Sequence, residues 1–398
     1  MLKGKTVVLG VTGSIAAYKT ANLASALKKL EADVHVIMTK NATNFINPIT
    51  FETLTGNKCL VDTFDRDFEF SVEHVSLADK ADVFIVAPCT ANVIGKIASG
   101  IADDMLTTTI MACKAKKIIS PAMNTNMFEN PIVQDNIEKL KKYDYEIIDP
   151  AIGYLACGDT GKGKMPEPEV LLEYILKEIA CEKDLEGKNV LITAGPTREA
   201  IDPVRFISNH STGTMGYALA KNAMRRGANV TLVTGPTNIE KPMFVDVVEV
   251  ISADEMFDAV DKVFDEQDIV IMSAAVADYK PKTQAKEKIK KSEKDVIIEF
   301  EENEDILFEM SKRKKDQFLV GFAMETENMI ENSRLKLEKK NLDLICANNL
   351  KTEGAGFGTD TNVVTLITKT DEEELPKASK DIVSSQILDK VCSRLKER

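Results

Sequence analysis

The sequence predicts an α/β protein of two domains, each built around a parallel β-sheet. The chain has 398 residues, which is more than one ordinary domain and suits two of about 150 to 200 residues. Two segments, Leu2-Lys3-Gly4-Lys5 and Leu185-Glu186-Gly187-Lys188, share a layout, and each leads into a short apolar run. Each run meets a glycine-containing turn, then apolar residues at helical spacing, then a second apolar run. This strand-turn-helix-strand order is the usual opening of a parallel α/β sheet.

Further apolar runs predict the remaining strands. In the first half these runs are 7–9, 33–38, 83–87, 117–120 and 146–148. In the second half they are 190–192, 229–233, 269–274, 296–300, 319–322, 342–347 and 363–367. A last helix is predicted over 381–395. The boundary falls in a short linker, 181–187, and divides the chain into domains at 1–180 and 188–398.

Composition and charge restrict the possible functions. With 44% hydrophobic and 29% charged residues the chain is globular, and its net charge of −12 disfavours nucleic acid as the main partner. The seven cysteines contain no Cys-x-x-Cys pair, and the three histidines form no zinc-ligand cluster. This pattern indicates reduced thiols in the cytoplasm. No apolar run is long enough for a signal peptide or a membrane span, so we expect a soluble cytoplasmic protein.

A phosphate-binding turn is predicted at the start of the first domain. Residues 10–16, which include Gly13 and Ser14, follow a strand and open a helix, where free N–H groups and the helix dipole favour an anion. The turn lacks the Gly-x-Gly-x-x-Gly order, and the second strand ends in Thr39-Lys40 instead of an acidic residue for a ribose. This favours a mononucleotide such as FMN over NAD and counts against a nicotinamide dehydrogenase. Alternatively, the glycines only let the helix pack on the strand.

Polar side chains follow two later strands of the first domain, where ligands bind in parallel sheets. Cys89, Thr90 and Asn92 follow one strand, and Met123 and Asn124 follow another. The Asn124 amide can donate to a carboxylate and accept from an amide N–H, although asparagine is also a common helix N-cap.

Two residues are candidates for proton transfer. His74 is expected near a helix start, and histidine titrates near neutral pH. Cys157 lies in the glycine-dense stretch 153–163, which we expect to be a mobile flap with an accessible thiol. Taken singly, each is more often structural or unreactive than catalytic, so the interpretation depends on their combination.

That combination resembles the flavin-dependent cysteine decarboxylases of coenzyme A biosynthesis. The resemblance is carried by Gly13-Ser14-Ile15-Ala16, His74, the segment Pro121-Ala122-Met123-Asn124 with Met127, and Ala156-Cys157-Gly158-Asp159, in this order. It implies a flavodoxin-like fold, FMN, and decarboxylation of 4′-phosphopantothenoylcysteine.

The resemblance also implies roles for single residues. His74 would be the catalytic base, Asn124 would bind the carboxylate and amide of the substrate, and Cys157 would return a proton. Met123 would contact the substrate. The flavin contacts would be Gly13, Ser14, Thr39, Cys89, Thr90 and Asn92. Phe128 stands where the family commonly has Trp or Tyr.

The second domain offers several groups that suit anionic oxygens. Residues 190–209 run from a strand into Gly, Thr, Arg, Ser and Asn side chains, and the glycine turn 211–216 follows at a helix start. The segment 280–294 holds seven lysines, equally consistent with polyphosphate binding and with a solvated surface. Asp278, at a strand end, is available to a metal ion or to a nucleotide hydroxyl.

This half resembles the bacterial phosphopantothenate-cysteine ligases. The resemblance is carried by the segments 194–199, 207–211, 274–279, 288–291 and 341–348. It implies a Rossmann-like fold and activation of 4′-phosphopantothenate by CTP and Mg²⁺ to an acyl-cytidylate, from which the amine of cysteine displaces CMP.

By this resemblance, Lys288 contacts the triphosphate, Asn209 serves the acyl-cytidylate step, and Arg205 helps to hold the phosphorylated substrate. Thr214 stands where some relatives have lysine. The positions that match nucleotide contacts are Ser273, Ala274, Asp278, Asp305, Ile306, Phe322, Lys336 and Lys340.

Together the two resemblances cover nearly the whole chain, which is identified as a member of the fused bifunctional enzymes. They imply 4′-phosphopantothenate, cysteine and CTP as substrates. They also imply trimeric decarboxylase and dimeric ligase contacts, consistent with a dodecamer. A scaffold protein that only kept the fold would be expected to lose His74, Asn124, Cys157 or Lys288, and all four are present.

Overall fold

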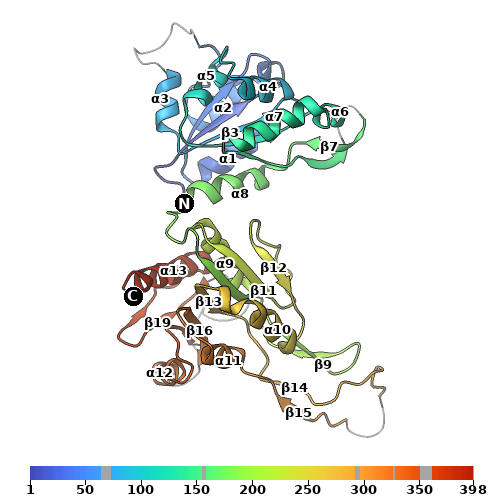
Figure 1. The fold of residues 1–398 in the computed structure, drawn as a ribbon, viewed down its shortest axis with the longest axis vertical. Helices are drawn as coiled ribbons and strands as arrows, with labels where there is room; N and C mark the ends of the chain where they lie inside the picture. The colour runs from blue at the N-terminus through green and yellow to red at the C-terminus, as the bar shows by residue number, and fades with distance from the viewer. Residues whose placement is uncertain (64–72, 155–157, 292–295, 326–327, 350–360, 398) are drawn as a thin grey trace. The chain divides into compact units, whose positions relative to one another are not determined.

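The computed structural model describes residues 1–63, 73–154, 158–291, 296–325, 328–349 and 361–397. The chain forms two compact units, Met1–Glu182 and Lys183–Arg398. Both are α/β units built on a largely parallel sheet (Figure 1), so the predicted fold class is confirmed.

The first unit contains a five-stranded parallel sheet in the order β2-β1-β3-β4-β5. Its strands are β1 (Thr6–Val11), β2 (Asp33–Met38), β3 (Val83–Cys89), β4 (Lys116–Pro121) and β5 (Tyr145–Ile147). Its helices are α1 (Ala17–Lys29), α2 (Pro48–Thr55), α3 (Glu73–Lys80), α4 (Ala91–Ser99), α5 (Met105–Ala112), α6 (Thr125–Phe128), α7 (Pro131–Lys142) and α8 (Pro168–Ile179), with a 3-10 turn at Ala42–Asn44.

Helices cover both faces of this sheet because the strands are apolar on both sides. Successive side chains of a strand point to opposite faces. Val7 and Leu9 pack in one cluster with residues of α1 and α8, whereas Val8 packs in a second cluster with residues of α4 and α5. Continuous apolar runs, rather than alternating ones, are what a doubly covered parallel sheet requires.

The second unit contains an eight-stranded sheet in the order β12-β11-β8-β13-β16-β17-β19-β20. The first six strands are parallel, and β19 and β20 are antiparallel additions. The strands are β8 (Asn189–Ala194), β11 (Asn229–Thr234), β12 (Asp246–Glu249), β13 (Ile269–Met272), β16 (Phe318–Glu325), β17 (Leu344–Asn349), β19 (Thr365–Ile367) and β20 (Glu372–Glu374). The helices are α9 (Thr214–Arg225), α10 (Ala253–Val263), α11 (Ile306–Lys312), α12 (Met329–Lys339) and α13 (Lys380–Lys396), with a 3-10 turn at Phe264–Glu266.

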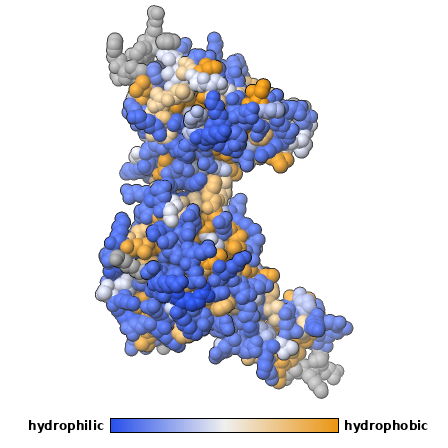
Figure 2. Space-filling view, viewed as in Figure 1, coloured by the Kyte–Doolittle hydropathy of each residue, from blue (hydrophilic) through white to orange (hydrophobic). Residues whose placement is uncertain are grey.

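Two antiparallel ribbons form an arm that projects from the sheet of the second unit (Figure 1). One ribbon joins β9 (Arg198–Ala200) to β10 (Phe206–Ser208), and the other joins β14 (Tyr279–Pro281) to β15 (Phe300–Glu302). Figure 2 shows apolar patches among hydrophilic side chains on this arm. The exposed apolar residues of the arm include Val204, Phe206, Tyr279, Val296, Ile297 and Phe300.

The structure of the arm shows that one strand prediction was wrong. The run 296–300 was expected to be a buried strand, but only Phe300 lies in a strand, and Ile297 is 87% exposed. The ribbon is two-stranded and lies outside the main sheet, so its apolar residues stay at the surface. Apolar runs alone do not distinguish such a ribbon from a core strand.

The glycine-dense stretch 153–163 is not a simple loop. It contains most of a hairpin of β6 (Ala151–Tyr154) and β7 (Thr160–Lys164), which packs beside α6. A Cβ atom on Gly161 would collide with the hydroxyl of Thr125, and one on Gly163 would collide with the carbonyl of Met123. These glycines therefore allow close packing of the hairpin, and the mobility expected for this stretch stays a prediction.

Each unit begins with the same local structure. Gly4 and Gly187 both adopt positive φ angles, 80° and 74°. The N–H of Leu2 donates to the carbonyl of Leu30, and that of Leu185 donates to Arg226, at 2.8 and 3.0 Å. Both leucines are buried. The repeated Leu-x-Gly-Lys pattern thus forms the same turn into the first strand of each sheet.

Residues 183–187, within the predicted linker, have fixed contacts in the second unit. Asp184 forms an ion pair with Arg226 at 2.5 Å, and Leu185 joins the core of that unit. Arg226 holds the pKa of the Asp184 carboxyl below its ordinary value.

Within the described part of the chain, none of the helices combines the length and apolar character needed to span a bilayer.

Candidate functional site

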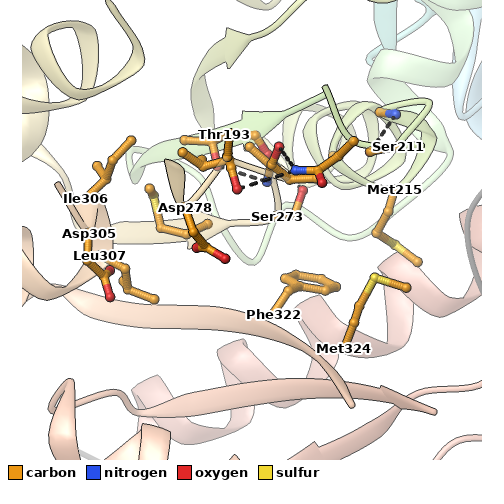
Figure 3. Close-up of a pocket in the computed structure, with 18 of the residues that line it drawn as sticks. Thr193, Ser211, Met215, Ser273, Asp278, Asp305, Ile306, Leu307, Phe322 and Met324 are labelled. Carbon is orange, nitrogen blue, oxygen red and sulfur yellow. Dashed lines mark hydrogen bonds between the residues drawn. The ribbon is translucent and has the colours of Figure 1, made fainter. Parts of the chain in front are cut away.

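The second unit contains a cavity of about 710 Å³ at the carboxyl ends of β8, β13, β16 and β17. Figure 3 shows the carboxylate of Asp278 and the ring of Phe322 facing the same space. Most of the residues predicted for the second domain meet in its wall. They are Asn209, Ser273, Ala274, Asp278, Asp305, Ile306, Phe322, Lys336 and Lys340.

The start of α9 forms part of the cavity wall. Gly213 precedes the helix with a φ of 82°, and no side chain caps the first turn. A Cβ atom on Gly216 would lie 2.8 Å from the hydroxyl of Ser273 and 2.9 Å from the carbonyl of Thr193. Only glycine lets the helix start approach the strand ends so closely. The uncapped N–H groups and the helix dipole make this edge suitable for phosphate oxygens.

Hydrogen bonds fix the segment that follows β13. The hydroxyl of Ser273 donates to the carbonyl of Thr193 at 2.8 Å, and the N–H of Ala274 donates to the hydroxyl of Thr193 at 3.1 Å (Figure 3). The Nδ2 of Asn209 donates to the carbonyl of Ala275 at 2.9 Å. This bonding joins Asn209, from the loop before α9, to the segment after β13, so two loops hold one side of the cavity.

The charged residues of the cavity wall are separated along the chain. Among the described lining residues, the carboxylates come from the segment between β13 and β16, namely Asp278, Glu302, Glu304 and Asp305. Its lysines are Lys336 and Lys340 at and just beyond the end of α12 and Lys380 at the start of α13. Lys340 forms an ion pair with Asp305 at 2.6 Å.

Asp278 was predicted as a metal ligand. No group of three or more His, Cys, Asp or Glu side chains suited to a metal ion occurs among the residues that the structure describes. Mg²⁺ is commonly held by one or two carboxylates together with substrate phosphates. Asp278 fits that kind of site and does not fit an all-protein metal cage.

Two predicted residues of the second unit lie outside the residues lining this cavity. Lys288 is exposed on the segment between β14 and β15. Arg205 bonds within the arm instead: its guanidinium donates to Asp202 at 2.5 and 2.9 Å and to the carbonyl of Ile289 at 2.7 Å. Arg205 therefore anchors the backbone next to Lys288.

Asp202 is the centre of this anchor. Its side chain has no exposed surface and accepts hydrogen bonds from the N–H groups of Val204, Arg205 and Ile289 at 2.9, 2.8 and 3.1 Å. The Arg205 guanidinium, followed by these N–H groups, holds the pKa of Asp202 below its ordinary value. Sequence reasoning missed this residue, although an acid three positions before an arginine was the available signal.

In the first unit the predicted flavin contacts lie at the carboxyl ends of adjacent strands. Gly13 and Ser14 follow β1, Thr39 follows β2, and Thr90 follows Cys89 at the end of β3. A Cβ atom on Gly13 would lie 2.8 Å from the Cβ of Asn41, so glycine lets these two turns meet. The sheet order thus brings the predicted residues to one edge.

Two helices start at this edge without a side-chain cap. The N-cap residues of α1 and α4 are Ala16 and Thr90, and neither side chain accepts a capping hydrogen bond. Asn92 is exposed in the first turn of α4. Ser120, near the end of β4, has a buried hydroxyl without a hydrogen-bond partner. Uncapped N–H groups and an unpaired hydroxyl suit a ligand rich in oxygen atoms, such as a phosphorylated flavin.

Cys89 is fully buried, and burial raises the pKa of its thiol. A protonated, inaccessible thiol is unreactive. Its place at the end of β3 is compatible with a role in shaping the edge.

Asn124 has the capping role that was considered as its alternative. It precedes α6, and its Oδ1 accepts from the N–H of Asn126 at 2.9 Å. Its Nδ2 donates to Asp159 at 3.4 Å, across to the hairpin segment that carries Cys157 in the sequence. Cys157 itself lies outside the described residues. Met123 is joined to the same hairpin through the carbonyl of Gly163 at 3.0 Å.

His74 lies near the start of α3 and is half-buried, in agreement with the predicted helix start. Leu77 and Ala78 of the same helix pack in the core with residues of α5. The core contact fixes the helix and leaves His74 close to the surface.

Sequence reasoning missed other parts of the cavity wall. Asn362 and Lys380 line it. Asn362 lies in β18 (Thr361–Asn362), which pairs with β21 (Ala378–Ser379), and Lys380 follows β21 as the first residue of α13. No periodic pattern in the sequence marks strands of two residues. Asn348, at the end of β17, could have been found from its position after an apolar strand.

Comparison with known proteins gives a match for each half of the chain. Residues 1–180 match the family described as "Flavoprotein". Residues 185–395 match the family described as "DNA/pantothenate metabolism flavoprotein C-terminal domain".

Curated relatives match along the full length. The coenzyme A biosynthesis bifunctional protein CoaBC of Bacillus subtilis is 49% identical, over 100% of this chain and 99% of the relative. The proteins of the same description from Vibrio vulnificus (strain CMCP6) and Escherichia coli are 45% and 41% identical, over 98% and 100% of this chain and 98% and 99% of the relatives.

Solved structures match single halves. The C-terminal domain of a CoaBC protein is 41% identical and covers 55% of this chain and 100% of that chain, with a TM-score of 0.48. The FMN binding protein AtHal3 is 30% identical and covers 44% of this chain and 95% of that chain, with a TM-score of 0.39.

Proposed function

The chain belongs to the family of bifunctional coenzyme A biosynthesis proteins, and from this membership we propose that its two units catalyse consecutive reactions. Residues 188–398 ligate cysteine to 4′-phosphopantothenate with CTP, and residues 1–180 decarboxylate the resulting 4′-phosphopantothenoylcysteine to 4′-phosphopantetheine. The observation that best supports the proposal is the convergence of nine predicted residues, from loops, helices and a strand far apart in the sequence, on one cavity of the second unit.

The ligation requires two displacements. A carboxylate is a poor acyl donor because its leaving group would be oxide. A carboxylate oxygen therefore attacks the α-phosphorus of CTP, pyrophosphate leaves, and an acyl-cytidylate forms. The amine of cysteine then attacks the acyl carbon, CMP leaves, and the amine loses a proton.

The cavity and the arm together offer groups for the charges in this sequence. The uncapped start of α9 and the wall residues Lys336 and Lys340 bind the phosphates. Lys288, which lies on the arm outside the described wall, neutralises charge on the leaving pyrophosphate. Asn209, whose Nδ2 donates to the carbonyl of Ala275, contacts the acyl-cytidylate. Mg²⁺ would be held by Asp278 together with the phosphates and would add positive charge there.

In the first unit, the strand-end groups would bind FMN. When bound, FMN would supply reversible two-electron oxidation of the substrate, which makes loss of CO₂ possible. His74 removes a proton from the substrate. Asn124 donates from Nδ2 to the substrate carboxylate because its Oδ1 is occupied by Asn126. Cys157 returns a proton at the end.

Assembly and location follow the family. The proposal includes trimeric contacts between decarboxylase units and dimeric contacts between ligase units, giving a dodecamer in the cytoplasm. Light scattering of the purified full chain measures the mass directly, and a monomer would contradict this part.

The test incubates the full chain with 4′-phosphopantothenate, cysteine, Mg²⁺ and either CTP or ATP, while pyrophosphate, CO₂ and 4′-phosphopantetheine are followed. All three products should form with CTP. Absence of pyrophosphate would overturn the ligase, and protein that stays colourless after FMN is added would overturn the flavin. A Cys157→Ala variant should release CO₂ without normal product, so normal product from this variant would contradict the proton-donor role.

A further inference from the structure

The segment that carries Lys288 is bonded to the other ribbon of the arm. Residues 282–291 form neither helix nor strand. The N–H of Ala285 donates to the carbonyl of Ile201, in the turn between β9 and β10, at 3.0 Å. This bond holds the segment shortly before Lys288, so a lysine on an irregular segment still has a restricted backbone.

Two further bonds hold the residue directly after Lys288. The N–H of Ile289 donates to Oδ2 of Asp202 at 3.1 Å. The carbonyl of Ile289 accepts from Nη2 of Arg205 at 2.7 Å. These two bonds form the Ile289 clamp. Both main-chain polar groups of this residue are bound by the same turn, so the clamp fixes the orientation of the backbone next to Lys288.

Asp202 joins the turn to the clamp because its two oxygens have different partners. Oδ1 accepts from the N–H groups of Val204 and Arg205 at 2.9 and 2.8 Å, inside the turn. Oδ2 accepts from the guanidinium of Arg205 and from the N–H of Ile289. The side chain of Asp202 has no exposed surface, so water does not compete for these bonds. One oxygen therefore shapes the turn, and the other holds the segment that carries Lys288.

A fixed backbone matters for the charge that Lys288 is proposed to neutralise. Its side chain is exposed, and a lysine loses much conformational entropy when it is held in one place. A charge that is already placed where the transition state needs it avoids part of this loss. A displacement of about 1 Å can lower a rate about 100-fold. The Ile289 clamp thus limits the positions that the ammonium group of Lys288 can take before the nucleotide binds.

We propose that Asp202 is a positioning residue for the ligation, which acts through Ile289 on Lys288. The inference rests on the proposed ligase function and adds to it a residue outside the cavity wall. Since its side chain has no exposed surface, Asp202 does not contact the substrates itself. Its carboxylate sets where the ammonium group of Lys288 lies relative to the leaving pyrophosphate.

The test compares Asp202→Asn, Lys288→Ala and the double variant of the full chain. In Asp202→Asn the remaining oxygen can stay on the N–H groups of the turn, and the new NH₂ then faces groups that only donate. The substitution thus breaks the clamp and keeps the turn. Asp254→Asn is the matched control, because it removes an exposed ion pair with Lys280 of the same arm.

Pyrophosphate release at varied CTP concentration gives kcat and KM. We expect Asp202→Asn to lower kcat about tenfold or more and to change KM for CTP less, because the positioned charge acts in the transition state. In the Lys288→Ala background the same substitution should lower kcat by less than about twofold, since the group that it positions is absent. Asp254→Asn should keep the kcat of the parent. CO₂ release from added 4′-phosphopantothenoylcysteine should be unchanged in all four variants.

A kcat of Asp202→Asn within about twofold of the parent overturns the proposal. An equal loss with and without Lys288 also overturns it, because the effect is then structural alone. If Asp202→Asn unfolds, a charge swap decides: Glu287→Lys with Lys288→Glu moves the ammonium group by one exposed position and keeps the net charge. This variant should lose kcat as Lys288→Ala does, and parental kcat would overturn the proposal.

Failure of the proposed function gives different results. A parent that releases no pyrophosphate with CTP or ATP contradicts the ligase function, and the positioning role of Asp202 with it. A parent that reacts normally, beside a Lys288→Ala variant that reacts equally well, contradicts the role of Lys288 and therefore any role of Asp202 through it. Impairment of Lys288→Ala without impairment of Asp202→Asn contradicts the positioning role alone.

Discussion

The two units share a sheet order but differ in the connection that follows the first strand. The order β2-β1-β3-β4-β5 corresponds to β11-β8-β13-β16-β17. After β1 the chain reaches α1 through residues 12–16, whereas after β8 it passes through residues 195–213 and the β9–β10 ribbon before α9. The sheet sets the edge at which ligands bind, and the connection sets which side chains reach that edge.

A second shared feature lies at the opposite edge. Asp82 accepts from the ammonium of Lys5 at 3.1 Å and from the N–H of Thr6 at 2.7 Å. Asp268 accepts from Lys188 at 3.0 Å and from the N–H of Asn189 at 2.9 Å. The sequence pattern that recurs at Gly187 therefore forms a structural repeat at the edge of each sheet opposite the predicted ligand-binding edge. The two units differ at the edge where the reactions are predicted to occur.

The largest expected effect tests whether the two sites are independent. His74→Ala should lower decarboxylation by about 100-fold to 10,000-fold, the usual contribution of a general acid or base, and leave ligation intact. Lys288→Ala should lower ligation by about 100-fold, as loss of one electrostatic contact to developing charge does, and leave decarboxylation intact. Separate assays of CO₂ release and pyrophosphate release measure this. A folded variant that lost both activities would show that the sites are coupled.

A smaller effect is expected from close packing at α9. Gly216→Ala should destabilise the second unit by about 1–3 kcal/mol, because the new Cβ atom would meet the Cβ of Ala194 at 2.5 Å. Gly95→Ala, in α4 of the first unit, is the matched control, since its Cβ atom would have ordinary contact at 3.7 Å. That change should stabilise by up to about 1 kcal/mol. Unfolding in urea measures both, and equal effects would refute the steric argument.

The shared edge predicts two equal effects. Asp82→Ala and Asp268→Ala each remove the partner of one strand N–H and one lysine, so each should destabilise its own unit by about 1 kcal/mol. Hydrogen exchange of peptides from β1 and β8 reports the two units separately. If one substitution destabilised its unit several times more than the other, the two turns would not be equivalent.

The smallest effect is a change in pH dependence in the arm. The pKa of Asp202 is lowered, so its stabilising effect is fully present above the ordinary value of about 3.9 and is lost as the pH falls through the lowered value. Asp202→Asn should therefore lower the melting temperature at pH 7, and the difference in melting temperature from the parent should narrow below about pH 4. Asp254→Asn, which removes an exposed ion pair with Lys280, is the control and should have little effect at either pH. A gap that stayed constant into acid would contradict the role of the charge.

The apolar runs were sufficient to predict most strands of the two sheets, and the family resemblance supplied most of the predicted residues of the cavity. Phe322 and Ser273 came from that resemblance, and both lie toward the carboxyl ends of parallel strands, which meet at one edge. The arm was not predictable from the same signal, since the apolar residues near Phe300 are exposed in a two-stranded ribbon outside the main sheet. The bonding of Arg205 to Asp202 became evident only from the fold, and the predicted contact of Arg205 with the phosphorylated substrate stays a prediction.

A different reason explains why the sequence did not predict that Lys380 and Asn362 line the cavity. They reach the cavity through β18 and β21, and each of these strands is two residues long. Such a pair leaves no repeat in the sequence, and its position depends on contacts made by chain segments far apart.

The contacts of residues 183–185 determine where the chain can be cut into two proteins. A second unit that started at Lys188 would lose the Asp184 carboxylate and leave the side chain of Arg226, which is 8% exposed, with Asp389 and the carbonyl of Ser385. It would also lose Leu185 from its core and the hydrogen bond from Leu185 to the carbonyl of Arg226. A cut before Lys183 keeps all of these groups, so the separated second unit should remain folded and the first unit should lose nothing from its sheet.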